Sequence, residues 1–427
     1  MRLLLLLTTL TAACGANLAP PASLDAGDPA PDAGRIADAG ISAEDGGSSP
    51  DAGSAPEDAG LPADSGYHCP EGYPMEDYAG KPVVEVAING NGPYRFIYDT
   101  GAPTSGIDLS LGARIGAGPY IVEIGGRHFD VPRFDQSDIH SSLRSNTIDG
   151  VVGADLFGVY IVSLDVQRRR YWLDEVRDEP ALLACGHTAG RPVEIGFIHD
   201  NYDYLPGRAE GIEGWFLLDS GASLGAMPDP IVDQLLAANP RPTLENMYTP
   251  AAIGIFWARM LTVADLEVGG LTVRHITTRS VPSGLLPVVP TPDQRPFLGV
   301  LPTLFLKHFL ITRDPYAGVI RFDAYVDDPL REPSEFFVSG ISLARSTTVA
   351  VVSSVIPGSG AEVAGIVPGD RVISVDGRTT ASLDAYSWPW MLMGREERQS
   401  LDVVIERAGL RSHHPVVVSD ALEAPER

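Results

Sequence analysis

The sequence predicts a mainly β protein in which two related lobes are followed by a smaller β module. The first observation is a repeated signature, because Asp-Thr-Gly-Ala at 99–102 and Asp-Ser-Gly-Ala at 219–222 each follow an apolar run. The second observation is that similar segments surround both copies, which lie 120 positions apart. An internal repeat of this length indicates a duplicated domain. The third observation is a series of glycine-containing turns between 356 and 377, typical of a small sheet domain.

Each copy of the repeat has the same order of elements. In the first, an alternating apolar run at 81–88 and turn residues at 89–92 predict a hairpin whose return strand ends at Asp99. In the second, a strand at 191–198 and a longer polar stretch precede the apolar run that ends at Asp219. Both copies then close with a glycine-containing apolar segment, a strand and a charged turn. These closing segments begin at residues 149 and 298.

At these residues the chain resembles the retropepsin-like bacterial aspartic peptidases. In that family a hydrophobic strand leads into Asp-Thr/Ser-Gly-Ala, and a later glycine-containing segment packs beside it. The resemblance covers about residues 80–325. It implies two lobes, at 67–180 and 181–333, that pack about a pseudo-twofold axis with Asp99 and Asp219 at the seam. The active site of a homodimer would then lie within one chain.

The two aspartates suit acid–base chemistry. Two carboxyl groups within hydrogen-bonding distance do not both ionise easily, so Asp99 and Asp219 are expected to share one proton. One carboxyl can take a proton from water while the other donates to an amide carbonyl. The sequence therefore predicts an aspartic endopeptidase that acts on protein or peptide substrates without a cofactor. The alternative is a catalytically inactive scaffold that binds peptides.

Four neighbouring residues are expected to support the aspartates. Gly101 and Gly221 allow the backbone to turn sharply and approach the other lobe, where a Cβ would obstruct the path. The hydroxyl groups of Thr100 and Ser220 can join the two loops by hydrogen bonds across the seam. An ordinary strand-end turn explains one such tripeptide, whereas two in matching repeats favour the functional interpretation.

Two features distinguish the second copy from the first. Pro302 stands where the first copy has Gly153, so the segment beside the second aspartate is expected to pack differently. The stretch from the aspartate to the next Gly-Gly turn is also longer, at 50 positions against 26. A flap hairpin over the cleft therefore fits only in the second copy. Its predicted tip comprises Ile253, Gly254 and Ile255.

Another motif overlaps the second aspartate loop. Gly-Ala-Ser-Leu-Gly at 221–225 fits the nucleophile elbow of serine hydrolases, and His275 and His308 follow it. That elbow requires a strand, a sharp turn and a helix in an alternating α/β chain, whereas these surroundings predict short strands. The nine histidines are scattered and the sequence has no His-Glu-x-x-His or Cys-x-x-Cys motif. No metal site is predicted.

The third module occupies residues 334–420. A β-rich stretch leads into Pro-Gly-Ser-Gly-Ala, then Ala-Gly-Ile and Pro-Gly-Asp, and the module closes with a hairpin. In these motifs it resembles the PDZ domain of bacterial envelope proteases. The resemblance implies that C-terminal peptides add as a strand to an open sheet edge, with backbone amides holding the terminal carboxylate. The residues expected to bind the peptide are Ser339, Gly340, Ile341 and Leu343.

Two further expectations concern this module. It could instead serve only for packing or dimerisation. Pro389 falls inside the helix expected beside the peptide groove, between 383 and 393, where proline distorts a helix.

The N-terminus predicts export from the cytoplasm. Residues 1–13 combine an arginine, a leucine-rich run and small residues just before Cys14, as in an export signal with its cleavage site. This resembles a bacterial lipoprotein signal, which implies a lipid on Cys14 and a place in the cell envelope, with the lipid as the membrane contact. Residues 14–66 are nearly all Ala, Asp, Gly, Pro and Ser and predict a disordered tether. Residues 421–427 form a short tail.

Charge and cysteine content limit the partners and the compartment. The formal net charge of −25 argues against a nucleic-acid partner. No later run of about eighteen apolar residues, the length that spans a bilayer, occurs. After the signal cysteine, Cys69 and Cys185 remain. In an oxidising compartment they can pair as a disulfide or remain buried thiols, and the sequence leaves both alternatives open.

Overall fold

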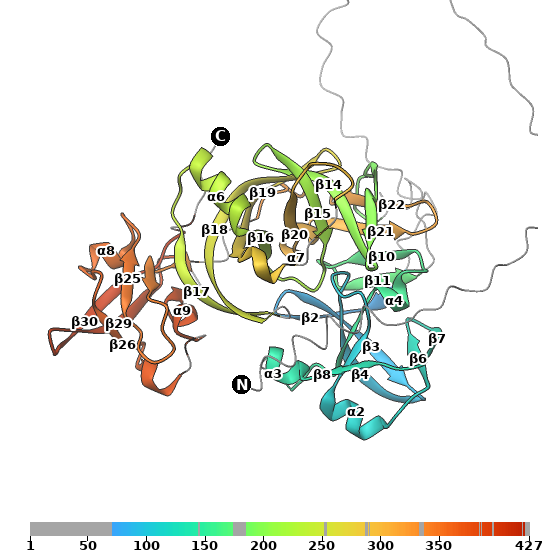
Figure 1. Ribbon diagram of the computed structural model, residues 1–427, viewed down its shortest axis with the longest axis horizontal. Helices are drawn as coiled ribbons and strands as arrows, with labels where there is room; N and C mark the ends of the chain where they lie inside the picture. Colours follow the sequence, from blue (N-terminus) through green and yellow to red (C-terminus); the bar gives the residue numbers. More distant parts are fainter. Residues whose placement is uncertain are drawn as a thin grey trace, which may run out of the picture. The chain divides into compact units, whose positions relative to one another are not determined.

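The computed structural model describes residues 71–143, 146–173, 185–251, 254–286, 289, 291–332, 337–383, 385, 387–394, 397–420 and 422. All of them belong to one compact unit, Asp64–Arg427. Strands predominate in it, so the prediction of a mainly β protein is confirmed (Figure 1). The predicted signal, Cys14, the tether and Cys69 lie outside the described residues. No helix among the described residues is long and apolar enough to cross a membrane.

The first half forms a sheet with the strand order β7-β6-β3-β4-β9-β5-β8, and β2 pairs with β3. The turn between β3 and β4 is a tight hairpin, because Asn89 and Gly90 both adopt positive φ, of 51° and 74°. Its elements are β2 (Glu76–Tyr78), β3 (Lys81–Ile88), β4 (Asn91–Tyr98), β5 (Gly106–Asp108), α2 (Leu109–Ile115), β6 (Tyr120–Ile124), β7 (Arg127–Val131), β8 (Asp135–Ser137), α3 (Ile139–Leu143), β9 (Gly150–Val152) and α4 (Ala154–Phe157).

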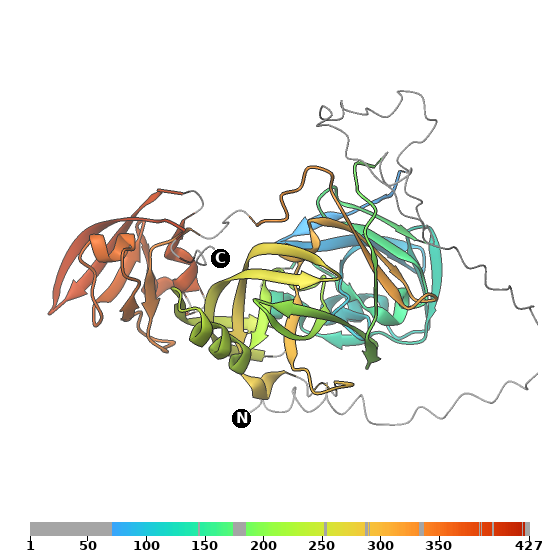
Figure 2. The same cartoon turned by 90° about the horizontal axis from the view of Figure 1, so that it is seen from above.

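The second half forms a sheet with the strand order β13-β14-β15-β20-β16-β19-β18-β17. Its longest strands form the β18–β19 hairpin, yellow in Figures 1 and 2. Its elements are β13 (Phe197–His199), β14 (Tyr202–Ala209), β15 (Ile212–Leu218), β16 (Gly225–Pro228), α6 (Asp229–Ala238), β17 (Leu244–Ala251), β18 (Gly254–Val268), β19 (Leu271–Val281), the 3-10 helix η2 (Ser283–Leu285), β20 (Phe297–Leu301) and α7 (Thr303–Leu306).

The two halves repeat one topology. In the first, β4 runs parallel to β9 while β5 crosses to pair with β9 antiparallel. In the second, β15 runs parallel to β20 and β16 pairs with β20 antiparallel. The Gly-Gly turns also match, since Gly125–Gly126 and Gly269–Gly270 each have two positive φ angles. The repeat in the sequence therefore corresponds to a repeat in the fold.

The halves differ between the aspartate loop and the Gly-Gly turn. In the first half α2 leads to β6 through residues 116–119. In the second, α6 is followed by the hairpin of β17 and β18, paired from Leu244↔Met260 to Ala251↔Gly254. Gly254 and Ile255 begin β18, whereas Ile253 lies outside the described residues.

A third sheet joins the halves, with the strand order β1-β11-β10-β21-β22-β12. Its centre is an antiparallel pair of β10 from the first half and β21 from the second, in which Ser163 lies opposite Thr312. The two hydroxyl groups there are 2.8 Å apart. The strands are β1 (Tyr73–Pro74), β10 (Val162–Asp165), β11 (Arg170–Leu173), β12 (Pro192–Glu194), β21 (Phe309–Asp314) and β22 (Val319–Ala324).

The third module has its own core, built around residues such as Val372, Leu401 and Val403. Its groove-side helix spans only Ser387–Met391, with Pro389 buried inside it. Leu422, assigned to a tail from the sequence, is buried with 1% of its surface exposed. The elements are β23 (Phe337–Val338), β24 (Ile341–Leu343), β25 (Val352–Val355), α8 (Gly360–Val363), β26 (Arg371–Val375), β27 (Arg378–Thr379), the 3-10 helix η3 (Thr380–Ser382), α9 (Ser387–Met391), β28 (Met393–Gly394), β29 (Ser400–Arg407) and β30 (Leu410–Val417).

Cys185 is disulfide-bonded. Cys14 and Cys69 lie outside the described residues. Of the two alternatives left open by the sequence, the free thiol is therefore wrong for Cys185.

Candidate active site

Asp99 and Asp219 follow equivalent buried strands, β4 and β15, and are fixed in the same way. The Asp99 N–H donates to the carbonyl of Val152 at the end of β9, at 3.0 Å. The Asp219 N–H donates to the carbonyl of Leu301 at the end of β20, at 3.3 Å. Each loop thus continues the parallel pairing of the strand before it, which holds both aspartates at the ends of rigid strands.

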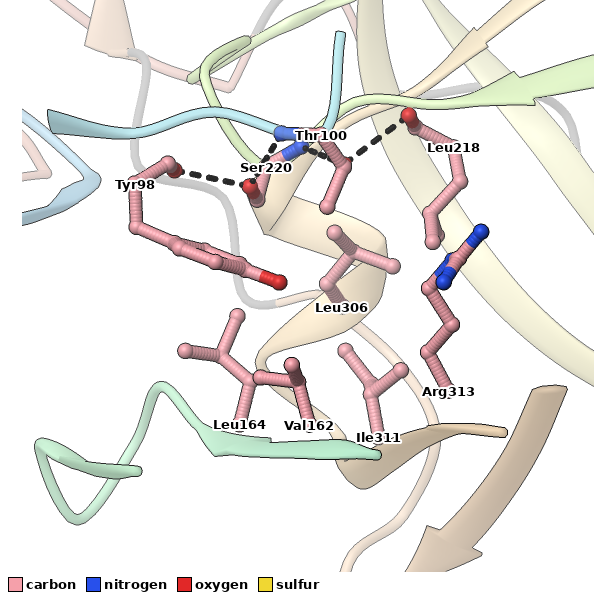
Figure 3. A pocket seen from close by; sticks show the side chains of 9 residues that line it. All are labelled: Tyr98, Thr100, Val162, Leu164, Leu218, Ser220, Leu306, Ile311 and Arg313. Carbon is pink, nitrogen blue, oxygen red and sulfur yellow. Dashed lines mark hydrogen bonds between the residues drawn. The ribbon is translucent and has the colours of Figure 1, made fainter. Parts of the chain in front are cut away.

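The two aspartate loops exchange hydrogen bonds through their hydroxyl groups (Figure 3). Thr100 Oγ1 donates to the carbonyl of Leu218 at 2.9 Å and accepts from the Ser220 N–H at 2.9 Å. Ser220 Oγ donates to the carbonyl of Tyr98 at 2.8 Å and accepts from the Thr100 N–H at 3.1 Å. The hydroxyl bonds expected across the seam are present, and each hydroxyl both donates and accepts one bond.

The glycines after these hydroxyls allow the loops to approach closely. A Cβ added to Gly101 would come well within 3.0 Å of the Asp219 carboxyl carbon, and one on Gly221 would do the same at Asp99. Each carboxyl group therefore lies against the backbone of the other loop. The Gly101 N–H also donates to Asp99 Oδ1 at 2.8 Å.

The two carboxyl groups are half-buried, and each acts on the pKa of the other. Burial raises the pKa of Asp99, although the Gly101 amide opposes this effect. Burial and then the negative charge of Asp99 raise the pKa of Asp219 well above its usual range. Because burial and mutual repulsion disfavour the doubly charged state, the pair retains a proton where isolated aspartates would be ionised.

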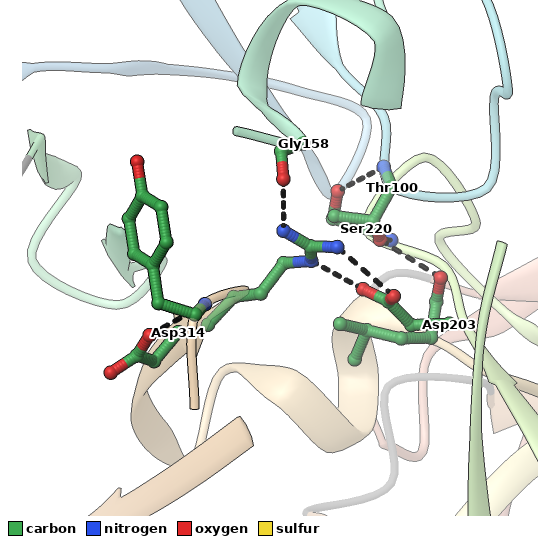
Figure 4. A network of polar contacts seen from close by, with 8 residues as sticks. Thr100, Gly158, Asp203, Ser220 and Asp314 are labelled. Atoms are coloured by element: carbon green, nitrogen blue, oxygen red, sulfur yellow. Dashed lines mark hydrogen bonds and ion pairs between the residues drawn. The ribbon is translucent and has the colours of Figure 1, made fainter. Parts of the chain in front are cut away.

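A buried ion pair lies beside the crossed hydroxyls (Figure 4). Arg313 of β21 contacts Asp203 of β14, with Nη2 and Oδ1 3.1 Å apart, and its Nη1 donates to the carbonyl of Gly158 at 2.9 Å. Gly158 belongs to the first half, so this arginine ties both halves together. Apolar side chains complete the floor below the hydroxyls, namely Val162, Leu164, Leu306 and Ile311 (Figure 3).

The segment at Pro302 keeps the backbone conformation of its counterpart at Gly153 but differs from it in its hydrogen bonds. Gly153 and Pro302 both cap a short helix in an extended conformation, and the φ of −80° at Pro302 suits proline. The Gly153 N–H donates to Ser105 Oγ at 2.9 Å, a bond that proline cannot make. In the second half Thr303 Oγ1 instead donates to the carbonyl of Ser220 at 3.0 Å.

Ser223 is not arranged as a hydrolase nucleophile. Its hydroxyl donates to the carbonyl of Ala79, and β16 follows the loop where an elbow would need a helix. Downstream, the ring of His308 lies 2.7 Å from Asp328 and 2.9 Å from Glu332. None of the hydrogen bonds found for Ser223 among the described residues involves a histidine.

Lys81 is a residue of the site that the sequence did not suggest. Its Nζ donates to Ser223 Oγ at 2.7 Å, across the seam between the halves. Its charge acts on both aspartates. The available signal was its rarity, since lysine occurs only at positions 81 and 307 of the chain.

In the third module, the predicted peptide site is partly occupied by internal bonds. The Ser339 N–H donates to the carbonyl of Leu392 at 3.0 Å, and the Ile341 N–H lies 3.3 Å from Ser339 Oγ. Gly340 has a φ of 86°, and Leu343 packs into the core. Within the described residues β24 pairs with β25 on one side only. No group of three His, Cys, Asp or Glu residues suited to a metal ion occurs among the residues that the structure describes.

Comparison with known proteins identifies the third module. A family model described as a PDZ domain matches residues 351–387, so this prediction is confirmed. No curated protein matches the chain. One similar solved structure is the photosystem II D1 C-terminal processing protease, at 24% identity and a TM-score of 0.19, over 20% of this chain and 24% of that chain. The chain thus spans about a quarter of that protein, and none of these comparisons supports the resemblance to aspartic peptidases.

Proposed function

We propose that this chain is an aspartic endopeptidase in which Asp99 and Asp219 form the acid–base pair. The observation that carries the proposal is the reciprocal support of the two loops. Each hydroxyl bonds the strand of the other half, and each carboxyl group lies against the glycine of the other loop. An ordinary strand-end turn needs neither arrangement. Two neighbouring carboxyl groups that share a proton can donate and accept protons in the same step.

The proposed reaction needs no covalent intermediate. The ionised carboxyl takes a proton from water as the water oxygen bonds to the scissile carbonyl carbon, and the protonated carboxyl donates to the carbonyl oxygen. When the resulting diol collapses, the C–N bond breaks and the leaving nitrogen takes the proton that the first carboxyl had removed from water. A diol hydroxyl returns a proton to the other carboxyl, which restores the pair.

The PDZ domain is proposed to bind peptide segments of substrates or partners. The family match supports this role. Strand β24 pairs with β25 and also packs against β17, where the Glu245 N–H donates to Ser342 Oγ at 2.8 Å, so a peptide would have to share this strand with β17. Because the Ser339 amide already has an acceptor, a peptide carboxylate would have to displace Leu392. Binding of synthetic peptides with free and amidated C-termini tests this, and equal affinities would exclude recognition of the carboxylate.

Export and lipid attachment at Cys14 remain proposals. The disulfide at Cys185 supports export, because stable disulfides are typical of oxidising compartments outside the cytoplasm. Labelling with a palmitate analogue in a bacterial host, with Cys14→Ala as the control, tests the anchor. Label retained in the alanine variant would exclude Cys14 as its site.

The catalytic proposal is tested by digestion of casein and of a peptide library between about pH 3 and pH 8. Asp99→Asn and Asp219→Asn should each lower kcat/KM by at least about a thousandfold, because both carboxyls take part in each turnover. The matched control is Asp130→Asn, which changes an exposed aspartate of β7. Turnover in either dyad variant at the wild-type rate would exclude the mechanism. Peptide binding without cleavage by the folded wild-type protein would favour the inactive scaffold.

A further inference from the structure

Lysine is rare in this chain, and one lysine lies at the seam. The chain has 31 basic residues, but lysine is found only at positions 81 and 307. Lys307 has a structural partner, since its Nζ lies 2.9 Å from Glu332. Lys81 begins β3 of the first half and donates to Ser223 Oγ at 2.7 Å. Ser223 belongs to the aspartate loop of the second half, so a cation of one half is fixed against the loop of the other.

The two hydrogen bonds of the Ser223 hydroxyl have defined donors and acceptors. The Ser223 hydroxyl donates a hydrogen bond to the carbonyl of Ala79, two residues before Lys81, and its oxygen accepts one from the ammonium. Ser223 is therefore already bonded as both donor and acceptor and is not poised to attack a substrate. It acts as a connector that holds the ammonium in place.

The charges around Lys81 explain how an ammonium is tolerated in a half-buried place. Burial, and then the nearby Arg279, lower the pKa of Lys81. The carboxyls of Asp99, Asp219 and Asp77 act in the opposite direction. A buried cation is costly without a compensating negative charge. An aspartate pair with one shared proton carries a single negative charge, which matches one ammonium.

We infer that Lys81 is the counter-ion of the aspartate pair and a positioning residue that ties the first half to the loop carrying Asp219. This role rests on the proposed function where it concerns catalysis. The coupling of charges between Lys81 and the pair is a property of the folded protein and is measurable without any substrate.

The sign of the effect on activity follows from electrostatics. A cation favours the ionised carboxyl, so Lys81 lowers the pKa of Asp99. Without the cation the pair releases each of its protons at higher pH. Since the active pair holds one proton, both limbs of a bell-shaped pH profile of activity move to higher pH.

The first experiment compares kcat/KM across pH in the wild type, Lys81→Met and Lys81→Arg. We expect the methionine variant to shift both limbs upward by about one pH unit, so that activity on the acid limb falls about tenfold, while arginine retains the wild-type profile. The control is Arg133→Met, a cation 80% exposed and 3.9 Å from Asp135. Coincident profiles for Lys81→Met and wild type would overturn the inference.

The second experiment needs neither activity nor a variant at position 81. Lysine labelled with carbon-13 at Cε gives two side-chain NMR signals, which Lys307→Arg assigns. The Lys81 signal should show an inflection in the acid range where the pair titrates, and Asp99→Asn should remove or shift it. A signal without that inflection would overturn the inference. An inflection in a protein that cleaves nothing at any pH would leave the inference standing and defeat the proposed function.

Discussion

The two halves of the molecule agree closely at the aspartate loops and diverge beyond them. Asp99 and Asp219 have equivalent backbone bonds, and Thr100 and Ser220 exchange equivalent hydroxyl bonds. Only the second half has the β17–β18 hairpin, whereas the first half contributes Lys81. The symmetric part is therefore the part in which each half completes the aspartate loop of the other. Elsewhere the halves differ in length and charge.

The strongest test of this symmetry is to fill the space at the two glycines. Gly101→Ala and Gly221→Ala should each lower kcat about a hundredfold or more, because the new Cβ displaces the opposite carboxyl group. The cost in stability should be small by comparison, about 1 kcal/mol, since a short side chain can yield. Steady-state kinetics and urea unfolding measure the two effects.

Gly284→Ala provides the matched control for the glycine variants. A Cβ at this position meets nothing within 4 Å, and the residue lies in a short 3-10 helix. Wild-type kinetics in Gly101→Ala but not in Gly221→Ala would show that the loops are not equivalent.

Removal of the crossed hydroxyls should give a smaller effect that is similar in both halves. Thr100→Val and Ser220→Ala each leave a buried backbone group without its partner, at a cost of about 1–3 kcal/mol in the free energy of unfolding. Thr100→Ser and Ser220→Thr retain the hydroxyl and serve as controls. The double variant should cost less than the sum of the single ones, because the bonds form one network. Strict additivity would contradict the reciprocal arrangement.

The smallest expected effect concerns the dependence of stability on pH. The folded-state pKa of Asp219 is raised by burial and by Asp99, so the folded protein holds a proton that the unfolded chain releases. Stability from this group is therefore present below the unfolded pKa and is lost as pH rises towards the folded one. Asp219→Asn should remove this loss and be the more stable protein at neutral pH, as thermal unfolding across pH would show. Parallel curves of stability against pH for the variant and the wild type would contradict the raised pKa of Asp219.

The sequence predicted the local features well. The repeated signature gave the positions of the aspartates, and the Thr100 and Ser220 hydroxyls indicated the bonds across the seam. The turn at Asn89 followed from residue types that adopt positive φ. These features depend on neighbours in the chain or on a repeat visible within it. The PDZ domain was likewise predictable from turns at fixed spacing.

Features that depend on distant residues were missed. Lys81 and Ser223 are 142 positions apart, and Arg313 meets Asp203 across 110. No local pattern indicates either contact, since both arise from the packing of the halves. The expectation for Pro302 held for the hydrogen bonds and not for the backbone, because the position needs an extended backbone that proline adopts, and Thr303 supplies a different hydrogen bond.

The sheet shared by the halves has a consequence for how the chain can be divided. If the chain were cut between β11 and β12, β10 would lose its partner β21, and each fragment would present an unpaired strand edge. Such edges are templates for pairing with another chain. We therefore expect the isolated halves to aggregate or to reassemble through this edge, because the sheet that β10 and β21 form is complete only when both halves are present.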